Sequence, residues 1–273
     1  DYVLAVNGVP IDTAMDPYAA FDGLADQTIA LTVNSTPTME GSRDVLVETI
    51  SSETQLRYRE WIEMNRQWVL EASEGTVGYV HVPNTGVSGQ TELVRQLNSQ
   101  HNLPGLIIDE RFNAGGQLPD RFIEKFNRPM VTRIFMRHGA TRTHPAISHY
   151  GAKAMIINGR AGSGGDAFPF FFKELKVGPI VGVRTWGGLI GPAVGHQLID
   201  GGRYTAPPGR LYGPDGVWFP EGIGVTPDIP VVDDPTLLAK GLDPQLKAAL
   251  DAVLEQLESN PPFFADPPEF EVR

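Results

Sequence analysis

The stretch AGSGGDAFPFFFKEL, residues 161–175, is the most informative part of this 273-residue chain. It follows MIINGR at residues 155–160, an apolar run that predicts a short buried strand ending in a turn. From residue 166 the sequence has the spacing of an amphipathic helix. Ser163 therefore lies at a strand-to-helix junction, where free backbone N–H groups and the helix dipole favour developing negative charge.

Two roles are compatible with Ser163 at this junction. A serine nucleophile needs a hydroxyl with little steric cover beside donors that stabilise negative charge, and the small neighbours of Ser163 leave such room. Serine is also a preferred helix N-cap and can stand there without any chemistry. The segment alone leaves both roles open.

Strands and helices alternate on both sides of this segment. Strands are expected at 77–82, 105–108, 154–157 and 179–183, and helices at 91–97, 120–126 and 166–175. This alternation predicts βαβ units and an α/β fold with a sheet that is covered on both faces. Further on, short strands are expected at 194–198, 203–205 and 217–219, then a closing amphipathic helix at 244–258.

The first 50 residues predict a small β-rich module. It has expected strands at 2–6, 29–33 and 45–50, a hairpin turn at Asn7-Gly8 and a helix at 18–25. The expected domains are this module at 1–50, a connecting helical segment at 51–75, a core at 76–259 and a Pro-rich tail at 260–273. Because a strand pattern begins at residue 2 without a preceding Met, we expect the sequence to be a fragment of a longer protein.

Composition excludes several classes of function. The chain has 22 Lys and Arg against 33 Asp and Glu, a net charge of −11, and no basic stripe, so neither nucleic acid nor an anionic membrane is expected as a partner. No apolar run approaches the roughly 18–20 residues of a membrane span. The absence of cysteine rules out disulfides, thiolate catalysis and Cys-zinc sites.

The six histidines do not predict a metal centre. They form no HExxH motif or other close ligand pair. His144 and His149 stand five apart in a loop rich in Thr, Pro and Ser, and we expect both to be solvated loop residues. No metal or cofactor is therefore expected.

A second glycine-rich loop follows an expected strand. GLII at 105–108 runs into DERFNAGGQL at 109–118, where Gly115 and Gly116 allow backbone N–H groups to approach a ligand. The loop is either a simple turn or half of an oxyanion hole, whose other half would be the N–H of Gly164. Two such loops at the ends of neighbouring strands indicate an oxyanion hole more strongly than either loop does alone.

Four segments together resemble the tail-specific serine protease family, and its tricorn branch most closely. They are RFNAGG (111–116), AGSGGD (161–166), GVRTWGGLIG (182–191) and PEGIGVTPDI (220–229), and YVLAVNGVPI resembles the latter part of a PDZ domain. The resemblance implies a crotonase-like, ClpP-like α/β core with Ser163 as nucleophile. It implies an oxyanion hole from Gly164 and either Gly115 or Gly116. Glu221, otherwise a plain loop carboxylate, stands where that branch has a glutamate that orients the charge relay.

The sequence departs from the family in its general base. Many tail-specific proteases use a lysine from a KTFGKG-like segment, but RTWGGL at 184–189 has none, and Arg184 stays protonated. Lys173 lies on the expected helix and should be at the surface. The tricorn branch uses a histidine that follows a serine, upstream of the PDZ module. We therefore expect the base before Asp1, and His81 to be a packed strand residue.

Three hypotheses follow. The first is a tricorn-like serine endopeptidase that cleaves peptides through an acyl-enzyme, here nearly inactive alone because the base is missing. The resemblance implies a homo-oligomer, hexameric or trimer-based, in the cytoplasm, with a periplasmic or secreted location as the alternative. Ile134 stands near the position of an acidic specificity residue, so no strong preference for basic side chains is expected. The other hypotheses are a non-catalytic peptide- or ligand-binding member of the fold, and a PDZ-like module that binds peptide C-termini.

Overall fold

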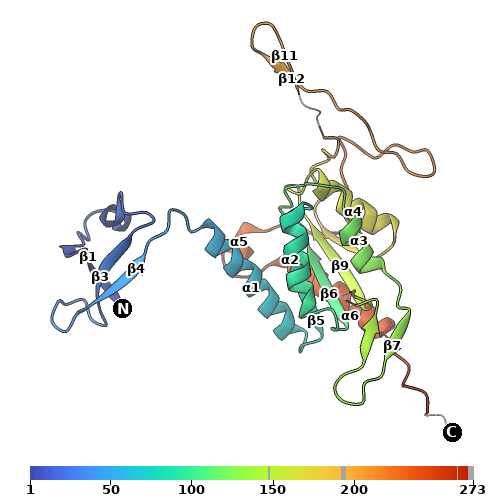
Figure 1. Cartoon of the computed structure of the whole chain (residues 1–273), viewed down its shortest axis with the longest axis horizontal. Helices are drawn as coiled ribbons and strands as arrows, with labels where there is room; N and C mark the ends of the chain where they lie inside the picture. The colour runs from blue at the N-terminus through green and yellow to red at the C-terminus, as the bar shows by residue number, and fades with distance from the viewer. Residues whose placement is uncertain (147, 192–194, 263, 270–273) are drawn as a thin grey trace. The chain divides into compact units, whose positions relative to one another are not determined.

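The computed structural model describes residues 1–273 except 147, 192–194, 263 and 270–273. The chain divides into two compact units, Asp1–Trp61 and Ile62–Arg273 (Figure 1). Each unit is described by itself below.

An antiparallel sheet forms most of the first unit. Its strand order is β2-β1-β3-β4, with β1 at Tyr2–Val6, β2 at Val9–Pro10, β3 at Thr28–Asn34 and β4 at Arg43–Glu48. The β1–β2 hairpin turns at Asn7 (φ 49°) and Gly8 (φ 78°), and two successive positive φ angles match the strand twist. The hairpin expected from Asn7-Gly8 is confirmed.

The helix expected at 18–25 is only partly correct. The chain forms a short 3₁₀-helix, η1, at Pro17–Phe21. Asp16 caps it by accepting a hydrogen bond from the Tyr18 N–H at 2.8 Å. It ends early because Gly23 adopts a left-handed conformation (φ 71°) one residue after the C-cap.

A five-stranded parallel sheet organises the second unit, as the alternation predicts. Its order is β13-β10-β9-β6-β5. The strands are β5 (Val77–His81), β6 (Gly105–Asp109), β9 (Ala152–Ile157), β10 (Ile180–Gly182) and β13 (Ile229–Pro230). β5, β6 and β10 are buried along their whole length, which suits a sheet covered on both faces.

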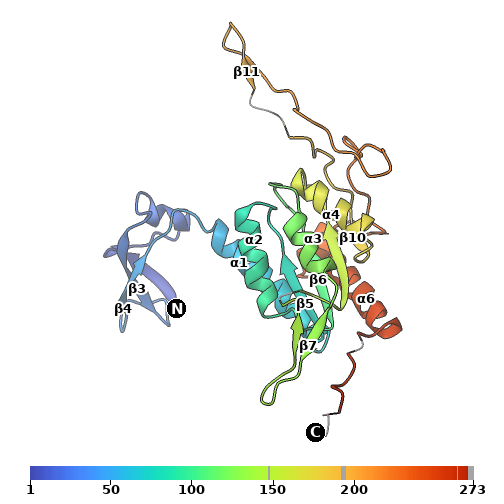
Figure 2. The same ribbon diagram turned by 45° about the vertical axis from the view of Figure 1, so that its right-hand side comes forward.

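Helices cover both faces of this sheet. α2 (Val87–Asn98), α3 (Asp120–Asn127) and α4 (Gly164–Glu174) connect successive parallel strands, so right-handed crossovers place them on one face. α6 (Pro244–Ser259) packs against β6, β9 and β10 from the other face (Figures 1 and 2). α1 (Thr54–Ala72) precedes β5, and the four-residue α5 (Pro235–Leu238) precedes α6. Phe122 and Phe126 of α3 pack on Phe168 of α4, with ring centroids 5.6 and 6.2 Å apart.

Short elements differ most from expectation. The hairpin of β7 (Thr132–Ile134) and β8 (Arg142–His144) was not predicted, because strands of three residues are too short to show an apolar periodicity. β11 (His196–Gln197) and β12 (Arg203–Tyr204) lie within expected strands, one of which begins outside the described residues. The strand expected at 217–219 is wrong, since Tyr212 and Trp218 form only an isolated bridge.

Lys153 of β9 is a buried cation that costs stability. Its side chain is 7% exposed and its ammonium donates to the Gly151 carbonyl at 2.8 Å. Burial lowers the pKa of Lys153 to about 8. The unfolded chain binds the Lys153 proton more tightly than the folded chain does. The loss of folding stability caused by the buried ammonium is therefore full below pH 8, and it fades as the pH rises toward the pKa of lysine in the unfolded chain, near 10.4.

We expect Lys153→Met to stabilise the chain at pH 7. A shift of about two pKa units corresponds to roughly 3 kcal/mol, and loss of the hydrogen bond leaves a net gain of about 1–2 kcal/mol. Urea unfolding at pH 7 and pH 10.5 measures it, and the gain should shrink at the higher pH. Lys247→Met, at an exposed lysine paired with Asp251, is the control and should change little. An equal gain at both pH values would contradict the buried-ammonium explanation.

Candidate active site

Ser163 occupies a strained turn between β9 and α4. It is the N-cap residue of α4 and has φ 57° and ψ −114°, an unusual conformation for a residue with a side chain. Its N–H donates to the Gly188 carbonyl at 3.0 Å and to Oδ2 of Asp166 at 2.9 Å. The N-cap position expected for Ser163 is confirmed, and the strained turn is the geometry in which hydrolases hold an exposed nucleophile.

Asp166 organises this turn from inside the protein. It is fully buried, and its carboxylate accepts N–H groups from Ser163 at 2.9 Å, Gly187 at 2.8 Å and Gly188 at 2.9 Å. One side chain therefore fixes the nucleophile turn to the segment after β10. Asp166 was not predicted as a site residue, although a serine followed three residues later by an acidic residue is a capping-box signal.

The Gly115-Gly116 loop faces Ser163 directly. Thr85 donates its N–H to the Gly115 carbonyl at 2.9 Å, and Ala114 donates to the Pro83 carbonyl at 2.9 Å, so the loop is held from behind. A Cβ added at Gly115 would lie 2.7 Å from Cβ and 3.2 Å from Oγ of Ser163. Glycine at this position keeps the space beside the serine hydroxyl open.

Hydrogen bonding distinguishes the backbone donors around that space. The Gly115 N–H donates to Oδ1 of Asn113 at 2.9 Å. Among the hydrogen bonds between described residues, none has the N–H of Gly116 or Gly164 as donor. A Cβ added at Gly164 would lie 3.2 Å from the Gly116 nitrogen, so the two glycines are close neighbours. Gly116 and Gly164 form the available pair of N–H groups.

Glu221 is linked to the Ser163 turn by hydrogen bonds to a neighbouring backbone segment. Its Oε2 accepts the N–H groups of Leu189 at 2.9 Å and Ile190 at 3.1 Å. The preceding residue, Gly188, supplies the carbonyl that accepts the Ser163 N–H. The Glu221 carboxylate therefore holds the backbone that holds Ser163.

The two cationic residues near the turn have structural partners. The Arg184 guanidinium donates to the carbonyls of Thr185 at 2.9 Å, Trp186 at 3.3 Å and Ile223. Lys173, on α4, is 41% exposed at its side chain and pairs with Asp228 at 2.9 Å. Lys173 thus lies at the surface, as expected.

The five histidines whose side chains the structure describes do not gather at Ser163. His81 is buried in β5, its Nε2 lies 3.0 Å from the Arg111 carbonyl, and burial lowers its pKa, as expected for a packed strand residue. His149 is 1% exposed, and burial, aided by the charge of Lys153, lowers its pKa to about 3. The expectation that His149 is solvated is wrong, because it lies just before the buried strand β9 and not in an open loop.

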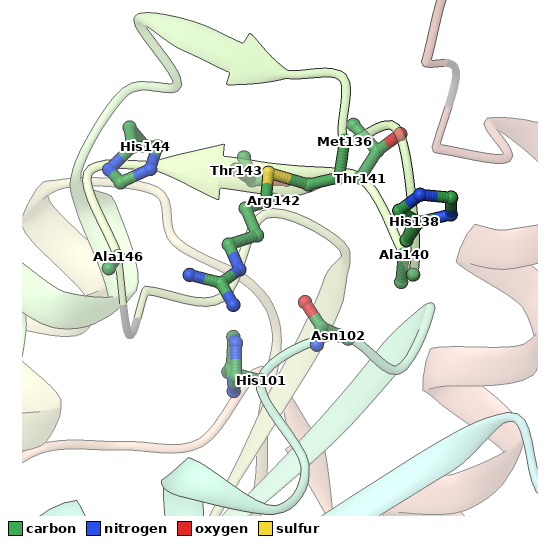
Figure 3. Close-up of a pocket in the computed structure, with 11 residues that line it drawn as sticks. His101, Asn102, Met136, His138, Ala140, Thr141, Arg142, Thr143, His144 and Ala146 are labelled. Atoms are coloured by element: carbon green, nitrogen blue, oxygen red, sulfur yellow. The ribbon is translucent and has the colours of Figure 1, made fainter.

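Three other histidines surround a separate hollow of about 480 Å³ (Figure 3). They are His101, His138 and His144, and the Arg142 side chain points toward His101 and Asn102. His101 precedes β6, at the amino ends of the parallel strands, whereas Ser163 follows the carboxyl end of β9. The hollow is therefore no part of the Ser163 site, and in the described part of the chain no three His, Asp or Glu residues are arranged to hold a metal.

An α/β sheet that carries a serine on a strained strand-to-helix turn, opposite two available N–H groups, defines the class of serine hydrolases. Residues 76–231 match the model of Peptidase family S41, and the chain belongs to that family. Within that family the chain is similar to tricorn proteases. No helix among the described residues is long and apolar enough to cross a bilayer.

Tricorn proteases are similar to nearly the whole chain. The chain is 37% identical to the tricorn protease of Thermoplasma acidophilum over 217 residues, 80% of this chain and 20% of that protein. It is 32% identical to the tricorn protease of Thermoplasma volcanium over 258 residues, which are 94% of this chain and 25% of that protein. A solved structure of the tricorn protease aligns with a TM-score of 0.85 at 33% identity, covering 94% of this chain and 25% of that one. The chain thus spans a quarter or less of these relatives' length.

Proposed function

We propose that this chain is the nucleophile-bearing part of a serine endopeptidase that hydrolyses peptides through an acyl-enzyme on Ser163. The observation that carries the proposal is the strained Ser163 turn placed against the available N–H groups of Gly116 and Gly164. These roles come from the geometry of the site and its likeness to tricorn proteases.

The reaction proceeds in two acyl-transfer steps. Ser163 Oγ attacks the scissile carbonyl carbon and passes its proton to a base, while the carbonyl oxygen becomes an oxyanion held by Gly116 and Gly164. Collapse of this intermediate expels the amine, which takes the proton from the base. Water then attacks the acyl-enzyme in the same way and releases the acid and free Ser163.

The base, in this proposal, is a histidine from outside this chain. His81 and His149 are buried, and His101, His138 and His144 lie at the other end of the sheet. A neutral imidazole is the usual partner of a serine nucleophile near pH 7. The chain alone should therefore turn over peptides very slowly.

Likeness to tricorn proteases supports three further proposals. The substrates are short peptides, without a strong preference for basic side chains. The protein assembles into a homo-oligomer and acts in the cytoplasm. The antiparallel sheet of the first unit is the latter part of a PDZ-like module.

A fluorophosphonate tests the nucleophile directly. Applied to the full-length protein, it should phosphonylate Ser163, with the modified peptide identified by mass spectrometry. Boiled protein is the control, since labelling depends on the folded site. A folded protein in which Ser163 stays unlabelled would favour a non-catalytic peptide-binding member of the fold.

Glu221→Gln is expected to lower kcat by about 10- to 100-fold. The amide retains the shape of the side chain but loses the negative charge that strengthens both hydrogen bonds to the single acceptor oxygen. The backbone that holds Ser163 loosens, and KM should change less than kcat. Steady-state kinetics on a peptide measure this, and Glu258→Gln, exposed on α6, is the control. A native kcat in Glu221→Gln would show that Glu221 has no role in catalysis.

A further inference from the structure

Glu110 is a buried carboxyl group that the mechanism above does not use. It directly follows β6 and is fully buried. Its backbone N–H donates to the Ile156 carbonyl at 3.0 Å, so the main chain is fixed in the sheet. Within the described residues, neither side-chain oxygen makes a hydrogen bond of normal geometry. A buried unpartnered carboxyl is costly, and its presence calls for a physical reason.

The surroundings of Glu110 favour its uncharged form. Burial raises its pKa well above the ordinary range, and the negative charges of Asp166 on α4 and Asp109 at the end of β6 raise it further. The Asn113 amide acts in the opposite direction and lowers this pKa. Burial and these two charges therefore favour the uncharged acid form of Glu110 over the carboxylate.

Asn113 connects this acid to both glycine loops. Its N–H donates to the Glu110 carbonyl at 3.2 Å, and its own carbonyl accepts the Gly162 N–H at 3.1 Å, one residue before the nucleophile. Its Oδ1 accepts the Gly115 N–H at 2.9 Å. Its Nδ2 is buried and, among described residues, makes no hydrogen bond of normal geometry. The orientation of this one amide thus decides whether the Gly115 peptide is held.

We propose that Glu110 is a positioning residue for the oxyanion loop: its buried carboxyl group keeps the Asn113 amide turned so that Oδ1 faces the Gly115 N–H. The inference rests on the proposed function and deepens it. Held this way, the Gly115 N–H is occupied and the next peptide presents the Gly116 N–H to the substrate. An uncharged acid also adds no negative charge where the oxyanion develops, whereas an ionised Glu110 would oppose it.

Two variants of similar size separate this role from simple packing. Glu110→Gln keeps an uncharged polar group, so its kcat at pH 7 should stay within about twofold of native, and the decline of native activity at alkaline pH should move upward or vanish. Glu110→Leu removes the polar atoms and should lower kcat by about tenfold with little change in KM. Its thermal midpoint should not fall, because an apolar side chain replaces a buried unpartnered acid. Glu124→Gln, exposed on α3, is the control for loss of a carboxylate.

A second readout separates failure of this inference from failure of the proposed function. Hydrogen exchange of the Gly115 amide, followed by NMR in the chain itself, should speed up about tenfold or more in Glu110→Leu and little in Glu110→Gln. Native kcat and native Gly115 exchange in the leucine variant would overturn the positioning role. If the native protein shows no turnover that depends on Ser163, the proposed function fails, and the exchange rates still decide whether Glu110 positions the loop.

Discussion

Replacing Ser163 with alanine is expected to lower kcat of the full-length protein by about three to six orders of magnitude. Alanine removes the attacking oxygen and leaves the rest of the site in place. The bonds that hold the turn, to the Gly188 carbonyl and Asp166, come from the backbone N–H and survive the substitution. KM and the thermal midpoint should therefore stay close to native, so the loss is one of chemistry.

The measurement is steady-state cleavage of a short fluorogenic peptide, with thermal unfolding recorded on the same samples. Ser259→Ala, at the exposed end of α6, is the matched control and should leave kcat unchanged. Residual activity above a tenth of native in Ser163→Ala would place the nucleophile elsewhere. The activity that remains in Ser163→Ala measures the rate enhancement that Gly116 and Gly164 provide without covalent catalysis.

Local patterns were sufficient to predict most of the fold and the strand-to-helix position of Ser163. The apolar runs at 77–82 and 105–108 predict buried parallel strands because a sheet covered on both faces needs no alternation. Ser163 was found because small residues between a strand and a helix are a local signal. The β7–β8 hairpin was missed because its strands are short.

The supporting residues of the site depend on contacts that no local pattern contains. Asp166 accepts N–H groups from Gly187 and Gly188, 21 and 22 residues further on, and only the folded chain brings them together. Glu110, in DERFN, has the composition of a solvated turn, yet it is fully buried. The proposed preference for Gly116 over Gly115 also needed the structure, because it depends on which N–H the Asn113 side chain already holds.

Arg111 is the centre of a buried ionic network that joins the sheet to α6. It is 3% exposed, its Nη2 donates to Asp109 at 2.7 Å, and its Nη1 donates to Asp243 at 2.8 Å. Asp109 is fully buried and also accepts the Tyr79 hydroxyl at 2.8 Å. Since Asp243 is the N-cap of α6, one guanidinium ties the end of β6 to the start of that helix.

Arg111→Met is expected to destabilise the second unit by about 3–5 kcal/mol at pH 7, because it leaves the Asp109 charge buried without its partner. Urea unfolding of the chain measures this. Arg95→Met is the matched control, since Arg95 pairs with Glu92 on the surface of α2 and its loss should cost at most about 1 kcal/mol. Equal effects of the two substitutions would mean that the buried network contributes no more than an exposed pair.

The pH dependence of this deficit identifies its origin. Burial alone would raise the pKa of Asp109, but the Arg111 charge and hydrogen bonds outweigh burial and hold that pKa below its ordinary value. In the native protein this stabilisation is present above the unfolded pKa near 3.9 and is lost as the pH falls through the lower folded value. In Arg111→Met, burial is opposed only by the weaker effects of His81 and the Tyr79 hydroxyl, so the pKa of Asp109 rises and protonation relieves the buried charge. The deficit should be largest at pH 7 and smaller near pH 4, whereas a deficit due to lost packing alone would not change with pH.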